Sequence, residues 1–554
     1  MQSKRALRPV IVAGAAIAVI VILAVLLLQG GGGSRTYKNK AEYYGMTSED
    51  QVPLIVDDAI SENFGKVIDG QVYVDYMTAW DLFNSAFYWS EEEQQLQEIM
   101  PAGTLSWTAD DSGDLVIDEE GTVYLSAELI RQNSDIDLAV YEEPLRIVAR
   151  TSWTGLTTAT ATEEAAVREK AGSRSEILTD LAQGDHVVCL DSSEEWYLVS
   201  TEDGCIGYLQ GENCQIDQTC AITHTSDEAY SFSHVMEEGR VTLAWQYVEG
   251  DAENSILGEL LTEVQGLGVV SPTWFSPANG AGDLNSTADA AYVETAHGAG
   301  LRVWALIGDV SGGETDTNEL LASAAARSHM IEQLMTAAEQ YGFDGINVDF
   351  ETITYDGAPA YLQFLKELCL AAHERGLTVS TDNYVPTYTA YYKRGEQART
   401  VDYIIIMGYE EHSSDSAEPG SVASLPFVED GIVSTLAEVP ADQVINAVPF
   451  YTRSWTEPFG SDMLYSDALG MDAGRAFAEE MGISLAWDDS VGQYTGSATD
   501  EEARYSIWLE DAESMAAKLD LAKQYELAGV AAWRLGLESS DVWPLFADYL
   551  AGEN

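Results

Sequence analysis

Residues 341–351 read YGFDGINVDFE, and this run predicts both a strand and the position of a polar site. Its second half alternates three apolar residues with three polar ones, Asn347, Asp349 and Glu351. Side chains of a strand alternate between its two faces, so the three polar groups share one face. Two carboxylates and an amide are costly to bury without a purpose. We therefore interpret the run as a catalytic strand.

Strand patterns alternate with helical patterns on both sides of this run, across residues 240–554. Eight strand candidates can be counted: VTLAWQYV from 241, VVSPTWFSP from 269, RVWALIGD from 302, GINVDFE from 345, TVSTDNYV from 378, VDYIIIMGYE from 401, QVINAVPFYTRSW from 443 and GVAAWRLGLE from 529. Most precede stretches rich in Ala, Leu and Glu, which favour helices. The sequence therefore predicts an α/β fold, a (β/α)8 TIM barrel, with an insertion in the long gap after strand seven. The active site belongs at the C-terminal ends of the strands, where Glu351 lies.

Asp349 and Glu351 are roughly 6.5 Å apart along the strand, at about 3.3 Å per residue. Two carboxyl groups this close in a partly dry site do not both ionise freely, so one of them holds its proton near neutral pH. The sequence therefore predicts a general acid on this strand.

These motifs resemble glycoside hydrolase family 18, the chitinase family, from about Arg240 to Tyr549. The family signature on strand four is D-G-x-D-x-D-x-E, and this chain has Asn347 at the middle acidic position. MGYE at 407–410 matches the family's M-x-Y-D, and Trp533 matches the strand-eight tryptophan. The strings VPFYTRSW, VGQY and IWLED are similar to the branch that acts on peptidoglycan and spore cortex as N-acetylglucosaminidases, which also has Asn at that position.

The resemblance implies a retaining, substrate-assisted hydrolase that cleaves β-1,4 bonds after N-acetylglucosamine, in peptidoglycan, spore cortex or chitin-type oligomers. Glu351 would protonate the leaving oxygen, while Asp349 and Tyr409 would orient the acetamide group. Asn347 is expected to shift the pH optimum. The predicted catalytic residues are Glu351, Asp349, Tyr409 and Asn347. The predicted substrate-binding residues are Trp533, Asp344, Glu410, Trp274, Asn383, Tyr384 and Arg453.

The first residues predict a membrane anchor. Three basic residues precede an uncharged apolar run at 9–28, about 20 residues, which is long enough to span a bilayer. We expect residues 1–8 in the cytoplasm, residues 29–37 as a linker and the remainder outside the cell or in the spore envelope, as a single-pass protein. A cleaved signal peptide is the alternative.

Two smaller domains are expected before the barrel. Residues 38–145 resemble the N-terminal domain of copper amine oxidases, a small α+β module, through VPLIVDDAI, VYVDYMTAWDLFN and VYLSAELIRQ; a helical patch is expected at 91–98. Residues 146–217 resemble a bacterial SH3 domain, a small β-barrel, through VREKAGSRSEILTDLAQGDHVVCL and EEWYLVSTEDGCIGYLQ. Residues 218–239 would be a linker.

Composition restricts the partners. The chain has 27 Lys plus Arg against 92 Asp plus Glu, a net charge of −65, which excludes a nucleic-acid partner but allows a neutral glycan. No cofactor is indicated, and no metal-ligand spacing occurs. Cys189, Cys205, Cys214 and Cys220 form a cluster that permits one or two disulfides in unknown pairing, while Cys369 stands apart.

Two non-enzymatic interpretations remain. The barrel is a glycan-binding, lectin-like protein in the first, and an envelope scaffold in the second. Retention of Glu351 favours an enzyme, because a barrel that only binds glycan has no use for a general acid.

Overall fold

The computed structural model describes residues 33–109, 113–220, 222–225, 230, 232–310, 315–461 and 463–552. The predicted anchor at 9–28 lies outside the described residues. In the part that is described, no helix has both the length and the apolar character needed to cross a membrane. The described residues form two compact units, one within 33–84 and 109–225 and the other within 85–108 and 230–552.

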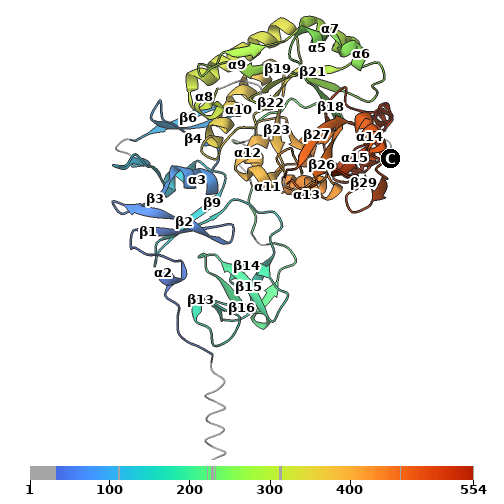
Figure 1. Cartoon of the computed structure of the whole chain (residues 1–554). Helices are drawn as coiled ribbons and strands as arrows, with labels where there is room; N and C mark the ends of the chain where they lie inside the picture. Colours follow the sequence, from blue (N-terminus) through green and yellow to red (C-terminus); the bar gives the residue numbers. More distant parts are fainter. Residues whose placement is uncertain are drawn as a thin grey trace, which may run out of the picture. The chain divides into compact units, whose positions relative to one another are not determined.

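A closed barrel forms the core of the second unit (Figure 1). Within the described residues, its eight parallel strands are β18 (Val241–Gln246), β19 (Val269–Pro277), β21 (Arg302–Gly308), β22 (Gly345–Asp349), β23 (Thr378–Tyr384), β24 (Tyr403–Met407), β25 (Val444–Pro449) and β31 (Gly529–Trp533). Strand β18 pairs with both β19 and β31 and so closes the barrel. The eight predicted strands and the TIM barrel are confirmed.

Helices follow the strands and cover the barrel from outside. They are α5 (Asp251–Ser255), α6 (Leu257–Leu260), α7 (Ala290–Gly298), α8 (Thr317–Ala322), α9 (Ala324–Tyr341), α10 (Ala358–His373), α11 (Pro386–Thr389), α12 (Arg394–Ala398), α13 (Leu425–Leu436), α15 (Ala512–Gln524) and α16 (Trp543–Ala551). Helix α9 begins after Ser323, whose hydroxyl accepts the backbone N–H of Ala326. It ends at Gly342, where φ is 77°, a conformation that suits glycine. Strand β22, which carries the predicted catalytic residues, follows directly.

The predicted insertion between strands seven and eight is present, and it folds as a separate antiparallel sheet. Its strands are β26 (Tyr451–Pro458), β27 (Tyr465–Gly470), β28 (Ala486–Asp488), β29 (Gln493–Thr499) and β30 (Ala503–Leu509), in the order β27-β26-β30-β29-β28, with α14 (Met471–Glu480). Glu510 and Lys518, both fully buried, form an ion pair of 2.9 Å at its return to the barrel. Strand β26 begins two residues after the end of β25, where the predicted site lies.

Three strands from early in the chain belong to the barrel unit. They are β4 (Phe87–Ser90), β5 (Gln95–Met100) and β6 (Gly103–Thr108), and they form a separate antiparallel sheet next to α8 and α10 (Figure 1). The Tyr88 hydroxyl donates to the carbonyl of Ala322 (3.0 Å) and accepts from Arg327 (3.1 Å). The predicted helical patch at 91–98 is therefore wrong: a turn and β5 occupy it, because Leu96 and Ile99 are buried on this sheet.

The first unit contains two sheets and three short helices, α2 (Lys40–Tyr43), α3 (Tyr76–Leu82) and α4 (Ala127–Gln132). The first sheet has the order β7-β8-β3-β2-β1-β10-β9. Its strands are β1 (Gln51–Val56), β2 (Ala59–Ile68), β3 (Gln71–Asp75), β7 (Leu115–Ile117), β8 (Val123–Ser126), β9 (Asp137–Tyr141) and β10 (Arg146–Arg150). Strand β10 pairs in parallel with β1, so residues 146–150 belong to the first sheet and the expected border at 145/146 lies too early.

The second sheet has the order β13-β12-β16-β15-β14-β11-β17. Its strands are β11 (Thr158–Ala161), β12 (Ala165–Arg168), β13 (Ile177–Leu181), β14 (His186–Asp191), β15 (Trp196–Thr201), β16 (Ile206–Gln210) and β17 (Cys214–Ile216). Its core includes Val167, Val199 and Leu209 together with Cys189 and Cys214. All five cysteines of the chain lie in the described residues, and each has a free thiol.

Candidate active site

Glu351 lies just beyond the carboxyl end of β22, and Asp309 holds its backbone in place. Asp309 follows β21, and its carboxylate accepts the backbone N–H of Glu351 (2.9 Å) and that of Thr352 (3.2 Å). Tyr392 donates its hydroxyl to the carbonyl of Phe350 (3.0 Å). These three bonds fix the turn after the strand, so the Glu351 side chain has a defined direction at the mouth of the barrel.

The Glu351 carboxylate accepts a hydrogen bond from the hydroxyl of Tyr384, the last residue of β23. Burial raises the pKa of Glu351 above its usual value, and the carboxylates of Asp309 and Glu410 raise it further. The Tyr384 bond opposes this increase, because it stabilises the ionised form. A carboxyl group held in this way retains a proton to higher pH than an exposed glutamate, which a general acid requires.

Asp349 lies two residues before Glu351 on the same face of β22. Its Oδ1 atom is buried and has no hydrogen-bond partner among the described residues. Burial raises the pKa of Asp349 well above its usual range, and the carboxylates of Asp382, Glu351 and Asp309 add to the increase. A buried acceptor without a partner costs free energy, so this atom is arranged to meet a donor that arrives with a ligand.

Asp382 is the neighbour of Asp349 on the next strand. Val348 pairs with Thr381 in the parallel register of β22 and β23, which puts the two aspartates side by side about 4.8 Å apart in backbone position. Asp382 is 2% exposed, and burial raises its pKa well above the usual range. Two carboxyl groups so placed cannot both be ionised, so the pair holds a proton.

Asn347 lies deeper in the barrel and its amide is fully hydrogen-bonded. Its oxygen accepts from Trp245 (2.8 Å) and Ser271 (3.2 Å), and its nitrogen donates to Ser380 (3.0 Å) and Asp382 (2.8 Å). A carboxylate at this position would have no hydrogen to donate to Asp382. The amide therefore orients Asp382 and adds no charge to the cluster.

A second group of polar residues lies at the ends of β24 and β26. Glu410 accepts hydrogen bonds from the hydroxyl of Tyr451 and from Arg453, whose Nη2 is 3.2 Å from both carboxylate oxygens. Tyr409 packs edge-on against Tyr451, with 6.3 Å between ring centroids. Burial raises the pKa of Tyr409, and the nearby Tyr451 and Asp349 add to this, so its hydroxyl stays protonated as a donor.

Trp533 lies next to this cluster, in contact with Trp245. It ends β31, and its ring lies 5.9 Å from that of Trp245, the tryptophan that bonds to Asn347. The structure therefore brings together seven of the predicted residues. They are Glu351, Asp349, Asn347, Tyr384, Tyr409, Glu410 and Arg453, with Trp533 adjacent through Trp245.

Three predicted substrate-binding residues lie elsewhere. Asp344 precedes β22 at the opposite end of the barrel, where it bonds to His297 (2.8 Å). Trp274 is 2% exposed and donates to Asn254 (2.9 Å) in the packing between strand and helices. Asn383 points outward and exchanges hydrogen bonds with Gln397 of α12. Each of the three has its polar group bonded away from the site.

Sequence reasoning missed Asp309 and Asp382. Both were visible in principle: Asp309 ends the run RVWALIGD, and Asp382 has the same strand parity as Tyr384. Asn383 and Tyr384 were both predicted to face the site, although neighbouring residues of a strand point to opposite sides. If Tyr384 alone had been assigned to the face toward the site, Asp382 would have followed, because it lies on the same face of the strand.

Part of the chain matches the model of a known protein family. Residues 275–538 match the model of glycosyl hydrolases family 18. Three Bacillus subtilis proteins are similar to this chain. The cortical fragment-lytic enzyme is 29% identical over 41% of this chain and 55% of its own length. The sporulation-specific glycosylase YdhD is 28% identical over 46% and 63%, and the uncharacterized glycosylase YvbX is 24% identical over 44% and 73%.

Solved structures agree on the fold. The spore cortex-lytic enzyme SleL of Bacillus cereus superposes with a TM-score of 0.51 at 20% identity, covering 56% of this chain and 74% of that one. A chitinase of Chromobacterium violaceum superposes with a TM-score of 0.50 at 21% identity, covering 57% and 100%. Both similarities lie in the barrel fold. The matched segment spans 55–73% of the length of the three Bacillus subtilis relatives.

Proposed function

We propose that this barrel, whose residues 275–538 match the model of glycosyl hydrolases family 18, is a glycosidase that cleaves β-1,4 bonds after N-acetylglucosamine in peptidoglycan or spore cortex. The observation that carries this proposal is the pairing of Glu351, bonded to Tyr384 and raised in pKa, with Asp349, whose Oδ1 lacks a partner. The first supplies a proton, and the second accepts one hydrogen bond from the substrate.

In the proposed reaction Glu351 gives its proton to the glycosidic oxygen as the bond from that oxygen to the anomeric carbon breaks. The acetamide oxygen of the same sugar forms a bond to the anomeric carbon and yields an oxazolinium-like intermediate. Asp349 accepts the acetamide N–H, and the Tyr409 hydroxyl donates to the acetamide. Water then attacks the anomeric carbon and gives a proton back to Glu351. Two displacements at one carbon leave its configuration retained.

Asp382 and Asn347 act on Asp349 as positioning residues in this proposal. The proton held between Asp349 and Asp382 keeps the pair at one negative charge, and Asn347 fixes the orientation of Asp382. Asp349 can then take a larger share of that negative charge as positive charge develops on the acetamide. Stabilising developing charge with groups that are already oriented costs no rearrangement during the reaction.

The substrate class rests on the relatives and on charge. The cortical fragment-lytic enzyme and SleL are named for spore cortex, and both match the barrel. The net charge of −65 disfavours polyanionic substrates, whereas the glycan strand itself is uncharged at N-acetylglucosamine. We also propose that residues 9–28 anchor the protein in the membrane, and that the segments resembling copper amine oxidase N-terminal and SH3 domains hold it at the wall.

The test is mass spectrometry of the fragments that the full chain releases from purified peptidoglycan and from spore cortex. We expect new fragments with N-acetylglucosamine at the reducing end, and none from Glu351→Gln. Loss of a general acid typically costs about 10²–10⁴-fold in rate. Glu418→Gln, the same change at an exposed glutamate in the loop between β24 and α13, should leave release unchanged. Binding to these glycans without any release by the wild type would instead support a glycan-binding barrel.

A further inference from the structure

Arg534 is the first residue after β31, and it directly follows Trp533 of the proposed sugar site. The backbone N–H of the next residue, Leu535, donates to the carbonyl of Trp245 (2.9 Å), whose ring lies beside that of Trp533. Leu535 is 1% exposed, so its side chain is also packed in place. The backbone on both sides of Arg534 is therefore fixed at the mouth of the barrel, next to the site.

The guanidinium of Arg534 lies over the ring of Tyr247, 5.4 Å from its centroid. Tyr247 follows β18, and its hydroxyl donates to the carboxylate of Glu249 (2.7 Å). The next backbone N–H, that of Val248, donates to the hydroxyl of Thr273 (2.8 Å), which fixes this turn. A guanidinium attracted to an aromatic face can still donate from its edge, through two parallel hydrogen bonds to a carboxylate. Arg534 is half-buried, so its side chain is both held and accessible.

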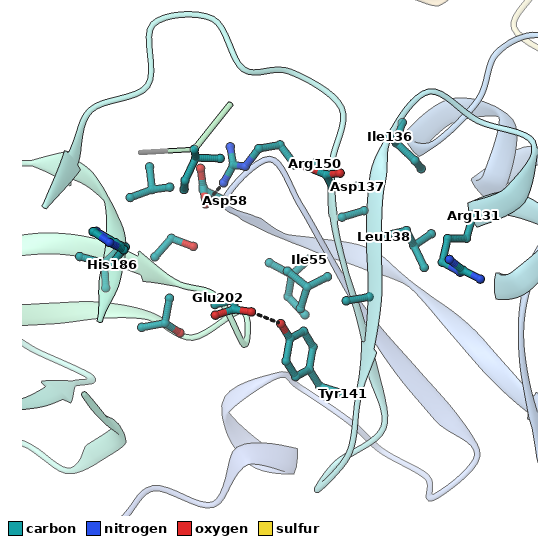
Figure 2. Close-up of a pocket in the computed structure, with 18 residues that line it drawn as sticks. Ile55, Asp58, Arg131, Ile136, Asp137, Leu138, Tyr141, Arg150, His186 and Glu202 are labelled. Carbon is teal, nitrogen blue, oxygen red and sulfur yellow. Dashed lines mark hydrogen bonds and ion pairs between the residues drawn. The ribbon is translucent and has the colours of Figure 1, made fainter. Parts of the chain in front are cut away.

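Arginines elsewhere in this acidic chain are commonly paired with carboxylates. Arg150, at the edge of a cavity of about 520 Å³ in the first unit, binds Asp58 (2.7 Å), as Figure 2 shows. Further arginines that bind a carboxylate, all in the barrel unit, are Arg302, Arg327, Arg375, Arg399, Arg453, Arg475 and Arg504. With 92 acidic residues for 27 basic ones, a carboxylate is available almost everywhere.

Arg534 departs from this pattern, because it forms no ion pair with any carboxylate in the part of the chain that the structure describes. Glu538, the nearest acidic residue along the chain, instead accepts the backbone N–H of Gly536 (2.7 Å). Arg453, the arginine inside the site, is neutralised by Glu410 (3.2 Å). The half-buried guanidinium of Arg534 is therefore a cation at the barrel mouth that remains available to an anion from outside the chain.

We propose that Arg534 binds a carboxylate carried by the sugar next to the N-acetylglucosamine at Trp533. The carboxylates of Asp349, Glu351 and Asp382 would otherwise repel such a substituent, so a cation beside them is needed to admit it.

This inference rests on the proposed function and narrows its substrate to strands in which N-acetylglucosamine alternates with N-acetylmuramic acid. Both neighbours of the cleaved sugar are then muramic acid, whose lactyl ether ends in a carboxyl group. That group is a free carboxylate where the stem peptide has been removed, and a short peptide on it ends in a carboxylate of its own. Chitin-type oligomers have neither, so Arg534 favours muramic acid strands over chitin.

The test measures binding of tetrasaccharides to the full chain of Glu351→Gln by isothermal titration calorimetry, since this variant should not cut them. The ligands are two N-acetylglucosamine–N-acetylmuramic acid repeats with free lactyl carboxylates, the same with lactyl methylamides, and the same with L-Ala on each lactyl group. We expect a Kd about tenfold lower for an acidic ligand than for the methylamide, because hydrogen bonds to a charged group are lost in the amide. Tightest binding of the free lactyl form identifies the lactyl carboxylate, and tightest binding of the L-Ala form identifies the peptide carboxylate.

Arg534→Gln, added to Glu351→Gln, should reduce the ratio of the methylamide Kd to the acidic-ligand Kd to about one. Arg534→Lys should keep a ratio of about three, because an ammonium retains the charge but not the two parallel hydrogen bonds. Arg504→Gln, at a side chain that is 53% exposed in the insertion, is the matched control and should keep the full ratio. Thermal melts verify that each variant is folded.

Equal affinity for the acidic ligands and the methylamide, a preference that persists in Arg534→Gln, or no saturable binding would each overturn this inference. Hydrolysis of the same ligands by the wild type is measured separately. A binding preference without any hydrolysis would defeat the proposed function alone, whereas hydrolysis without a preference would defeat the role of Arg534 alone.

Discussion

The hydroxyl of Tyr384 donates a hydrogen bond to the carboxylate of Glu351, from the end of one barrel strand to the end of the strand before it. Burial and neighbouring carboxylates raise the pKa of Glu351, and this bond is the interaction that works against them. The pKa of Glu351 is therefore set by the balance between burial with neighbouring carboxylates, which raise it, and the Tyr384 hydroxyl, which lowers it.

Tyr384→Phe removes that hydroxyl with little change in shape. The pKa of Glu351 should rise further, so the basic limb of the pH dependence of kcat/KM should move to higher pH. The rate at the optimum should fall about 10- to 100-fold, because the acid also loses its orientation. Tyr388→Phe, at a side chain that is 54% exposed in the following helix, is the matched control. A basic limb that stays in place would show that Tyr384 does not tune Glu351.

Asp382→Asn should make the protein more stable at neutral pH and less active. The folded-state pKa of Asp382 is raised, so the folded chain binds more protons than the unfolded chain between about pH 4, the ordinary value for Asp, and that raised pKa. Wild-type stability therefore falls as pH rises through this window. Asparagine does not titrate, and its oxygen still accepts the Asn347 amide.

Denaturant unfolding at a series of pH values checks this second prediction. The variant and the wild type should be equally stable below about pH 4, where Asp382 is protonated in both states, and should diverge above it. Activity should fall about tenfold or more, since Asp349 loses the partner that shares its proton. The prediction is contradicted if the stability of the variant relative to wild type is lower at pH 7 than at pH 4. Such a result would mean that ionised Asp382 does not destabilise the folded chain.

Asn347→Asp introduces the acidic residue that the family 18 signature has at this position, and it should destabilise the fold. The two hydrogens that Asn347 donates to Ser380 and Asp382 are lost, and a carboxyl group takes their place beside a buried carboxyl. Leaving buried acceptors unsatisfied costs about 1–3 kcal/mol, which urea unfolding at pH 7 measures. Asn285→Asp, the same change at an exposed site, should cost almost nothing. An unchanged free energy of unfolding would mean that the amide does not organise Asp382.

Tyr88→Phe tests whether the sheet of β4–β6 stabilises the barrel unit. The variant loses the bonds to Ala322 and from Arg327 and keeps the ring beneath the Arg327 guanidinium, 4.9 Å away. We expect a loss of about 1–3 kcal/mol in the free energy of unfolding. Tyr465→Phe, at a side chain that is 52% exposed, should have no effect. If the two variants lose the same free energy of unfolding, the Tyr88 hydroxyl does not stabilise this unit.

The barrel could be predicted because its information is local. Each strand is marked by a run of apolar residues, such as Ile404–Ile406, and most strands are followed by a stretch suited to a helix. The candidate acid could be predicted for the same reason, since Asn347, Asp349 and Glu351 alternate on one strand. The insertion followed from the length of the gap before Gly529.

Relations between distant segments could not be predicted. Whether β5 is a strand depends on α10, more than 250 residues later, and a Glu-rich run alone favours a helix. The membership of β10 in the first sheet depends on its parallel pairing with β1, about 90 residues earlier. Trp274 shows the same limit within the barrel. The sequence near a strand end does not distinguish an aromatic residue that contacts a sugar from one that packs in the core, as Trp274 does against Tyr292.

The β4–β6 sheet is synthesised long before the helix against which it packs. Its strands leave the ribosome about 250 residues before α10 begins, which at about 5–20 residues per second is an interval of roughly 12–50 s. During that time Trp89, Leu96 and Ile99, all nearly fully buried in the finished fold, have no barrel to pack against. The nascent chain must therefore carry an exposed apolar sheet through nearly half of its own translation, and a ribosome stalled before α10 would present that sheet to chaperones.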